Sequence, residues 1–168
     1  QSGLISIDGT DIKDFDLQAL RHKMALVLQD VFLFSGSVFE NITLRDESIS
    51  REKVLSAAKM IGAHEFIEKL PGGYDYQVME RGATLSMGQR QLISFVRALV
   101  FEPDILILDE ATSSIDPASE SVIQKAIETL IAQRTSIIIA HRLSTIMHAH
   151  KILVMQRGEV MESGSPED

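Results

Sequence analysis

Three runs of apolar residues recur along the chain, and each one leads into a polar residue. One of them is Ile105–Leu108, which is followed directly by Asp109 and Glu110. Met24–Leu28 and Ser136–Ala140 have a similar apolar character. Because such runs lack regular polar alternation, they are typical of strands buried on both faces of a parallel sheet. The sequence therefore predicts a parallel sheet built on these three strands.

Helical periodicity and helix-end signals dominate the middle of the chain. Ser50 is a predicted N-cap for a helix that ends at Gly62, since serine caps helix starts and glycine favours helix ends. A shorter helix is expected from His64 to Leu70, where Pro71 and two glycines stop it. This change of period indicates a helical region inserted between two of the strands.

The longest helix of this region is expected to begin at Ser86. Ser86 and Gln89 form a capping-box pattern, and Pro103 ends the helical periodicity. With Gly88 in its first turn, such a helix start leaves backbone N–H groups open to an anion, and the helix dipole favours phosphate there. An ordinary capped helix is the alternative interpretation.

Shorter patterns complete an α/β fold. They predict a strand at 4–7 that runs into an Asp-Gly turn, a helical turn at 17–23, a loop at 74–84, a helix from an Asp116 cap to about residue 132, and strands at 151–155 and 158–161. We expect a core of residues 1–36 and 103–168 and a helical subdomain of about residues 37–102. The first strand has no preceding element to pair with, so we expect the sheet to be incomplete at the N-terminus.

Composition excludes several classes of function. The formal net charge of −8 argues against a nucleic-acid surface, which needs a concentrated basic face. With no cysteine, the chain has no disulfide framework and no thiolate metal site. No apolar run approaches the roughly 20 residues that span a bilayer, and no signal peptide is visible. We expect any membrane role to come through a partner or a missing part of the chain.

The polar residues that follow the three strands have catalytic potential. Gln29, the pair Asp109 and Glu110, and His141 each come at or just after a strand end, where open α/β sheets bind ligands. In phosphate chemistry the first acid suits a Mg²⁺ site, and the second can orient or deprotonate a water. Taken singly, each has an ordinary structural alternative. Gln29 also suits a loop amide, and Asp109-Glu110 also suit an acidic turn. His141 also suits a histidine at a strand end whose hydrogen bonds are satisfied within the fold. Together they favour a site for a γ-phosphate and a water.

Four motifs then occur in the order and spacing of one family. They are Gln29, LSMGQRQL at 85–92, ILILDEATSSID at 105–116 and IIIAHRLST at 137–145. This pattern, which covers essentially the whole chain, strongly resembles the ATPase domain of ABC transporters. The resemblance implies a P-loop NTPase-like (RecA-like) core with an inserted α-helical subdomain, and it implies ATP and Mg²⁺ as substrate and cofactor.

The resemblance also implies a role for each residue around the hydrolysed phosphate. Gln29 matches the Q-loop glutamine, which contacts Mg²⁺ and couples to the transmembrane domain. Asp109 matches the Walker B aspartate, which would also bind Mg²⁺. Glu110 matches the general base that activates the attacking water, and His141 matches the switch histidine that contacts the γ-phosphate.

Two further motifs are implied to act between two ATPase domains. Ser86, Gly88 and Gln89 belong to the signature motif, which reaches across a head-to-tail dimer to the ATP of the partner. The segment from Ser113 to Asp116 resembles the D-loop, and both residues are expected at the nucleotide.

Subfamily features point to an exporter whose ATPase domain lies at the cytoplasmic face of the cell membrane. The segment Tyr74–Gly82 resembles the stretch that touches intracellular coupling helices in exporters, and Gln29–Phe34 resembles the exporter Q-loop region. Apolar residues in that loop suit a docking surface for a membrane subunit, although local core packing of Phe32 and Phe34 is the alternative.

Some positions depart from the family pattern. Met87 stands where the signature motif usually has its first glycine, Met79 replaces a glycine of the exporter segment, and Ser114-Ile115 replaces Ala-Leu in the D-loop. No G-x-x-x-x-G-K-[ST] occurs, so the Walker A loop that cradles the phosphates is missing. We interpret the chain as an N-terminally truncated ATPase domain and expect no turnover from it alone. An importer subunit, a soluble ABC ATPase and a non-catalytic interaction module are the rival interpretations.

Overall fold

Three of the predicted strands form one parallel sheet in the order β3 (Met24–Val27), β6 (Ile105–Asp109) and β7 (Thr135–Ile139). The register aligns Leu26 with Ile107 and Ile107 with Ile137. These are the strands that the continuous apolar runs predict, and the α/β class is confirmed.

The computed structural model describes residues 3–79, 82–109, 117–140 and 143–166. The other elements of these residues, in chain order, are β1 (Ser6–Ile7), β2 (Thr10–Asp11), η1 (Ile12–Asp14), α1 (Leu17–His22), β4 (Gly36–Ser37), α2 (Val38–Thr43), α3 (Arg51–Ile61), α4 (His64–Glu68), η2 (Gly73–Asp75), β5 (Gln77–Val78), α5 (Met87–Val100), α6 (Pro117–Ile131), α7 (Leu143–Ile146), β8 (Ile152–Gln156) and β9 (Glu159–Gly164).

The sheet is buried on one face only within the described residues. Leu106 and Leu108 are almost fully buried and join the same apolar cluster as residues of α5 and α6. On the opposite face Leu26, Ile137 and Ile139 are 60%, 56% and 52% exposed. The expectation of strands buried on both faces is therefore wrong for this chain, because no described element covers the second face.

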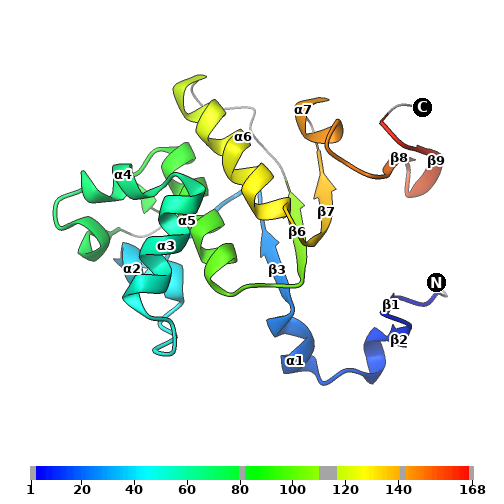
Figure 1. Ribbon diagram of the computed structural model, residues 1–168, viewed down its shortest axis with the longest axis horizontal. Helices are drawn as coiled ribbons and strands as arrows, with labels where there is room; N and C mark the ends of the chain where they lie inside the picture. The colour runs from blue at the N-terminus through cyan, green and yellow to red at the C-terminus, as the bar shows by residue number, and fades with distance from the viewer. Residues whose placement is uncertain (1–2, 80–81, 110–116, 141–142, 167–168) are drawn as a thin grey trace.

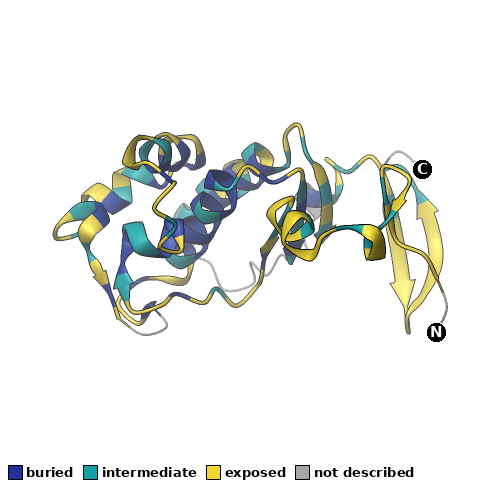
Figure 2. Ribbon diagram, turned by 90° about the horizontal axis from the view of Figure 1, so that it is seen from below, coloured by how far each residue is buried: buried dark blue, intermediate teal, exposed yellow. Residues whose placement is uncertain are grey.

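The helix α5 is the centre of the hydrophobic core. It packs against α2, α3, α6 and β3 (Figure 1). Figure 2 shows that burial is concentrated in α5 and its neighbours, whereas the β8–β9 hairpin is largely exposed. The buried cluster runs from the sheet into the helices without interruption. The proposed division into a core and a helical subdomain stays a prediction.

The ends of α3 and the start of α5 have the capping residues that the sequence predicts. The Ser50 side chain accepts a hydrogen bond from the Lys53 N–H at 3.2 Å, and Gly62 closes α3 with φ +82°. The left-handed backbone at Gly62 is the conformation that side chains disfavour, so glycine is required there. α5 has the capping box predicted for Ser86 and Gln89.

Several short elements were not predicted, among them α2 and the pair β4 and β5. α2 has only six residues, too few to show a helical period, although Ser37 and Glu40 form a capping box at its start. Within the segment predicted as a loop, β5 pairs with β4, with Val78 opposite Gly36. The partner strand lies far away in sequence, so no local pattern indicates this pairing.

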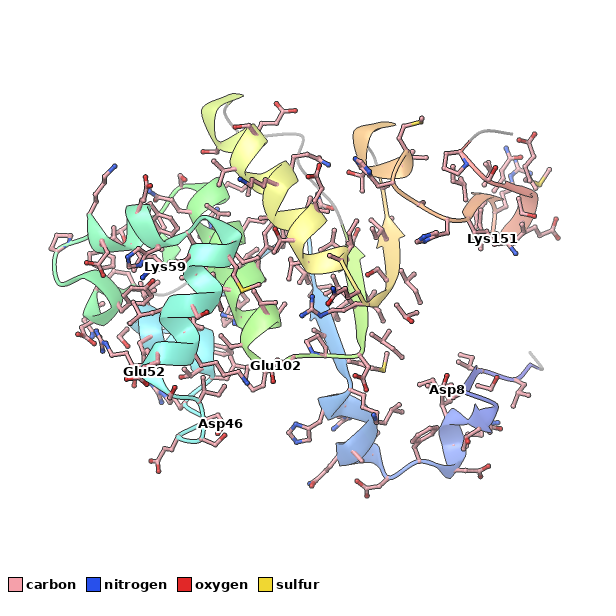
Figure 3. The ribbon with its side chains drawn as sticks, in the orientation of Figure 1. Asp8, Asp46, Glu52, Lys59, Glu102 and Lys151 are labelled. Atoms are coloured by element: carbon pink, nitrogen blue, oxygen red, sulfur yellow. The ribbon has the colours of Figure 1, made fainter. Side chains whose placement is uncertain are left out.

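The remaining strands form two antiparallel pairs. β8 pairs with β9, the two joined strands that the sequence predicts. β1 pairs with β2 across the Asp8-Gly9 turn, where the sequence predicts the first strand and the turn but not β2. The labelled charged residues in Figure 3, which include Asp8, Glu102 and Lys151, lie on the outside of the molecule. Among the described helices, none combines the length and the apolar character that crossing a membrane requires.

Candidate functional site

The carboxyl edge of the parallel sheet brings two of the predicted site residues together. Asp109 is the last residue of β6 and is half-buried, with Ile139 beside it in register. Val27, the last residue of the neighbouring strand β3, pairs with Leu108. Gln29 follows Val27 by two residues and is exposed in a bend. Both side chains therefore start from the same edge of the sheet, where parallel sheets bind ligands.

Four predicted residues lie outside the described residues: Glu110, Ser113, Asp116 and His141. Their predicted places rest on the sequence alone. Glu110 directly follows the end of β6, and His141 comes two residues after the end of β7.

The side-chain oxygens at this edge suit a magnesium ion that is bound together with phosphates. No group of three or more His, Cys, Asp or Glu side chains that could hold a metal occurs in the described part of the chain. Mg²⁺ commonly binds one or two protein oxygen ligands and completes its octahedral shell with waters and substrate phosphates. The carboxylate of Asp109 and the amide oxygen of Gln29 fit that pattern, and they do not form an all-protein cage.

The start of α5 presents a capped but open helix end. The Ser86 hydroxyl accepts from the Gln89 N–H at 3.2 Å, and the Gln89 side-chain oxygen accepts from the Ser86 N–H at 3.0 Å. Other first-turn amides have no partner inside the helix. Gly88 is buried and Ser86 is exposed. This helix of 14 residues keeps its positive end available to an anion.

The two segments predicted to contact a membrane domain lie side by side. The Val38 N–H donates to the Tyr76 carbonyl at 3.0 Å, next to the β4–β5 pairing. Gly82 has φ +66°, and a Cβ placed there would lie 3.1 Å from Leu33 and 2.8 Å from the Arg90 side chain. The close approach of these segments therefore requires glycine at this position.

The aromatic residues of the first segment point outward. Phe32 and Phe34 are 51% and 53% exposed and form an edge-to-face pair with ring centroids 5.0 Å apart. Leu33 between them is fully buried, and Met79 of the second segment is 62% exposed. Core packing of the two phenylalanines is excluded, and the surface they form is apolar.

Two residues that hold this surface were not identified from the sequence. Asn41 accepts from the Phe34 N–H at 2.8 Å and donates to the Phe34 carbonyl at 2.9 Å. Arg97 donates through Nε to the Asn41 carbonyl at 2.8 Å, and burial lowers the pKa of its guanidinium. The only available signal for Arg97 was a charged residue within the apolar periodicity of α5.

A polar cluster fixes the start of the second segment. The buried Tyr74 hydroxyl lies 2.9 Å from His64 Nδ1, and burial raises the pKa of Tyr74 to about 12. Arg51 donates two hydrogen bonds to the Asp75 carboxylate, at 3.1 and 3.2 Å.

The ion pair of Arg51 and Asp75 predicts a pH-dependent contribution to stability. Hydrogen bonds from Arg51 hold the pKa of Asp75 below its ordinary value of 3.8. A lowered pKa in the folded state stabilises the fold above that ordinary value, and the contribution is lost as pH falls through the lower folded value. We expect the difference in melting temperature between the wild type and Asp75→Asn to be present at neutral pH and to shrink below about pH 3.8. A difference that stays constant through the acid range would contradict this account.

Comparison with known proteins identifies relatives over the whole chain. The family model described as "ABC transporter" matches residues 1–113. The chain is 49% identical over 168 residues to the probable multidrug resistance ABC transporter ATP-binding/permease protein YheH of Bacillus subtilis, covering 100% of the chain and 25% of that protein. It is 48% identical to the putative multidrug export ATP-binding/permease protein YgaD of the same organism, covering 99% and 29%. A putative multidrug export ATP-binding/permease protein of Staphylococcus aureus is 52% identical over 164 residues, covering 98% and 28%. The chain thus spans only about a quarter of the length of these relatives.

Proposed function

The chain belongs to the ABC transporter family, and on this premise we propose that it forms part of the ATP-hydrolysing domain of a longer export protein. The observation that carries the proposal is the shared sheet edge of Gln29 and Asp109. An amide and a carboxylate at this edge suit a magnesium-bound triphosphate. The relatives are named as multidrug ATP-binding/permease proteins, which supports export as the process that hydrolysis drives.

We assign the hydrolytic roles to residues at the ends of β6 and β7. Asp109 and Gln29 would hold Mg²⁺, which neutralises charge on the transferring phosphoryl group when bound. Glu110 would take the proton of the attacking water, and His141 would donate a hydrogen bond to the γ-phosphate. Ser113 and Asp116 would lie at the nucleotide.

The start of α5 would serve the nucleotide of a second ATPase domain. Ser86, Gly88 and Gln89 present a hydroxyl, a small residue and helix-end amides, which together suit a γ-phosphate. In a head-to-tail dimer each site would combine one domain's Asp109 and Glu110 with the partner's helix start. ATP binding would close the dimer, and hydrolysis would reopen it.

The exposed aromatic pair supports docking to a transmembrane domain. Phe32 and Phe34 belong to one of the two segments assigned to coupling helices, Gln29–Phe34, and the exposed Met79 belongs to the other, Tyr74–Gly82. The two segments approach each other at Leu33 and Gly82. Large apolar side chains grouped on a surface commonly mark an interaction site. Because Gln29 lies in the first segment, movement of the docked helices would reach the magnesium site directly. The ATPase domain would then lie at the cytoplasmic face of the membrane.

Hydrolysis by two forms of the protein tests the proposal. The full-length protein should release phosphate from ATP only with Mg²⁺, so excess EDTA should reduce hydrolysis to background. The 168-residue chain alone should show no turnover, because it contains no Walker A motif to hold the triphosphate. ATP hydrolysis by the 168-residue chain that disappears in Glu110→Gln would contradict the expectation of no turnover. Hydrolysis by the full-length protein that persists in EDTA would contradict the requirement for Mg²⁺.

The rival functions differ in what accompanies the hydrolysis. A soluble ABC ATPase would hydrolyse ATP without any membrane part, and an importer subunit would bind a separate permease. The acidic charge of the chain and its exporter-like segment disfavour these two. A non-catalytic interaction module would bind a partner without hydrolysing ATP.

A further inference from the structure

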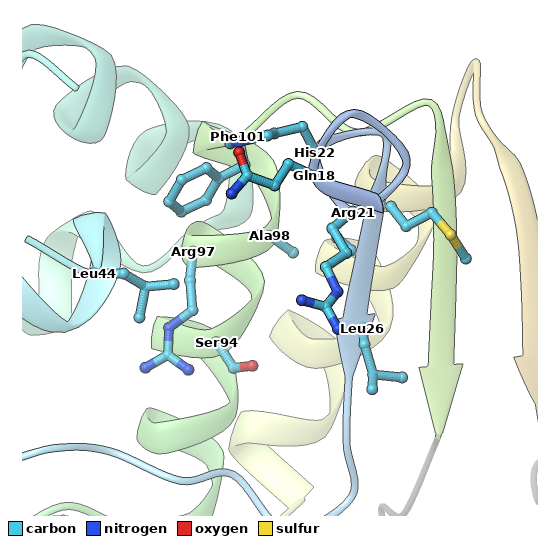
Figure 4. A pocket seen from close by; sticks show the side chains of 11 residues that line it. Gln18, Arg21, His22, Leu26, Leu44, Ser94, Arg97, Ala98 and Phe101 are labelled. Atoms are coloured by element: carbon cyan, nitrogen blue, oxygen red, sulfur yellow. The ribbon is translucent and has the colours of Figure 1, made fainter. Parts of the chain in front are cut away.

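The methionines of this chain lie mainly on its surface, although methionine is usually among the buried residue types. Met24 is half-buried and lines a pocket of about 520 Å³ beside Ala98 and Phe101 (Figure 4). The other six of the seven are between 40% and 62% exposed: Met60, Met79, Met87, Met147, Met155 and Met161. Because the chain has no cysteine, thioethers are the sulfur groups that an oxidant meets at this surface.

One of these methionines stands at the start of α5. Met87 is the first residue of this helix, between the N-cap Ser86 and Gly88, and it is 40% exposed. Side chains of a helix lean toward its N-terminus, so the thioether of Met87 extends over the helix start. The amides of Met87 and Gly88 belong to the first turn and have no partner inside the helix. The same helix start therefore carries an oxidisable sulfur and the donors for which we propose a phosphate.

Oxidation of Met87 would change this helix start without unfolding it. A thioether is apolar and a weak hydrogen-bond acceptor, whereas a sulfoxide is polar and carries a partly negative oxygen. On the flexible side chain of Met87 this oxygen can accept from the first-turn amides. It would then compete with a phosphate for these donors and repel the negative charge of the phosphate. The capping box joins Ser86 and Gln89 and does not use the side chain of Met87, so the helix should remain.

We propose that Met87 is a reversible oxidation site, at which hydrogen peroxide converts the thioether to a sulfoxide and thereby lowers ATP hydrolysis by the full-length protein. The sulfur lone pair forms a bond to one peroxide oxygen while the O–O bond breaks. The hydroxide that leaves takes the proton from the transferred oxygen and becomes water. Sulfur loses two electrons, and the peroxide gains them. The inference rests on the proposed function and adds a form of regulation to the start of α5.

The reverse reaction makes the site a switch. Methionine sulfoxide reductases return a sulfoxide to the thioether. With a dithiol as the reductant, the sulfoxide oxygen leaves as water and the dithiol becomes a disulfide. Hydrolysis that is lost through Met87 should therefore return when these reductases act, because no bond of the main chain has changed.

Peroxide treatment of the full-length protein tests this site. After each dose the sample is divided between peptide mass spectrometry and an assay of Mg-ATP hydrolysis. The loss of wild-type hydrolysis should rise in step with the fraction of sulfoxide at Met87. Methionine sulfoxide reductases with dithiothreitol should restore hydrolysis. Dithiothreitol alone should not, because it reduces oxidised thiols and leaves methionine sulfoxide unchanged.

Two leucine variants separate Met87 from the other exposed methionines. Leucine removes the reactive sulfur and keeps an apolar side chain of similar size, and each variant is compared with its own untreated sample. Met87→Leu should keep most of its hydrolysis at a peroxide dose that inactivates the wild type. Met60→Leu, at a 57% exposed methionine of α3, is the matched control and should lose hydrolysis as the wild type does.

Two results would overturn the proposal. One is an equal loss of hydrolysis in Met87→Leu and the wild type at a dose that oxidises Met87 in the wild type. The other is a Met87 that stays unoxidised at a dose that oxidises Met60. A failure of the proposed function is distinct from both, because the untreated wild-type protein would then not hydrolyse Mg-ATP.

Discussion

Asp109→Asn in the full-length protein should lower Mg-ATP hydrolysis by about 10² to 10³-fold, the usual effect of removing one group that stabilises transition-state charge. Asparagine keeps the size of the side chain at the end of β6 and removes its negative charge. Mg²⁺ would then lose a charged ligand at the sheet edge that also carries Gln29. Phosphate release at saturating ATP, measured over a range of Mg²⁺ concentrations, gives the effect.

Asp104→Asn is the matched control for this substitution. Asp104 precedes the same strand at its opposite end, where it is exposed and pairs with Lys23. An exposed pair of this kind contributes little to stability, so this variant should hydrolyse ATP like the wild type. Equal losses in both variants would attribute the effect to damage of β6. Wild-type hydrolysis by Asp109→Asn would remove Asp109 from the site.

The elements that the sequence predicts well are those determined by neighbouring residues. The apolar runs at Met24–Leu28 and Ile105–Leu108 appear as β3 and β6, and the caps Ser50 and Ser86 stand at the starts of their helices. In each case the physical cause lies within a few positions of the residue: a continuous apolar run in a strand, or a hydroxyl that satisfies an amide three residues later.

Features that depend on distant parts of the chain were not predictable. The pairing of β4 with β5 joins residues about 40 positions apart in sequence, with Gly36 opposite Val78. In the sequence, Arg97 is only a charged residue that interrupts the pattern of an amphipathic helix. Its hydrogen bond to the Asn41 carbonyl is seen only in the fold. The open face of the sheet has the same origin, because an isoleucine at a strand position does not reveal whether a helix will cover it.

The candidate site also has parts that the sequence predicts and parts that depend on the fold. The motifs locate Gln29 and Asp109 in sequence, and the parallel register explains why both reach one edge. The positions of Glu110 and His141 remain predictions. The polar ties from Arg90 to the Gly82 and Leu85 carbonyls, at 3.5 and 3.3 Å, were not anticipated. They join the start of α5 to the segment Tyr74–Gly82, for which we propose docking, so that a displacement of this segment would be transmitted to Ser86.

Phe95→Ala should destabilise the domain by about 3–5 kcal/mol, the usual cost of emptying a buried aromatic site. Phe95 is fully buried in α5, the helix that contacts α2, α3, α6 and β3. A typical domain is stable by only about 5–15 kcal/mol, so the loss would be a large fraction of the total. The free energy of unfolding of this domain, from urea titration of the purified protein, measures the change.

Phe34→Ala removes a phenylalanine side chain from the surface. Comparison with Phe95→Ala therefore distinguishes an effect on folding from an effect on docking. Phe34 is 53% exposed, so its loss should change the unfolding free energy of the uncomplexed domain by no more than about 1 kcal/mol. The aromatic pair with Phe32 would be broken, and contact with the transmembrane domain would weaken. Similar destabilisation by both substitutions would mean that Phe34 packs into the core. If transport is lost in Phe34→Ala while the unfolding free energy is unchanged, Phe34 acts in docking. Phe95 then acts in folding.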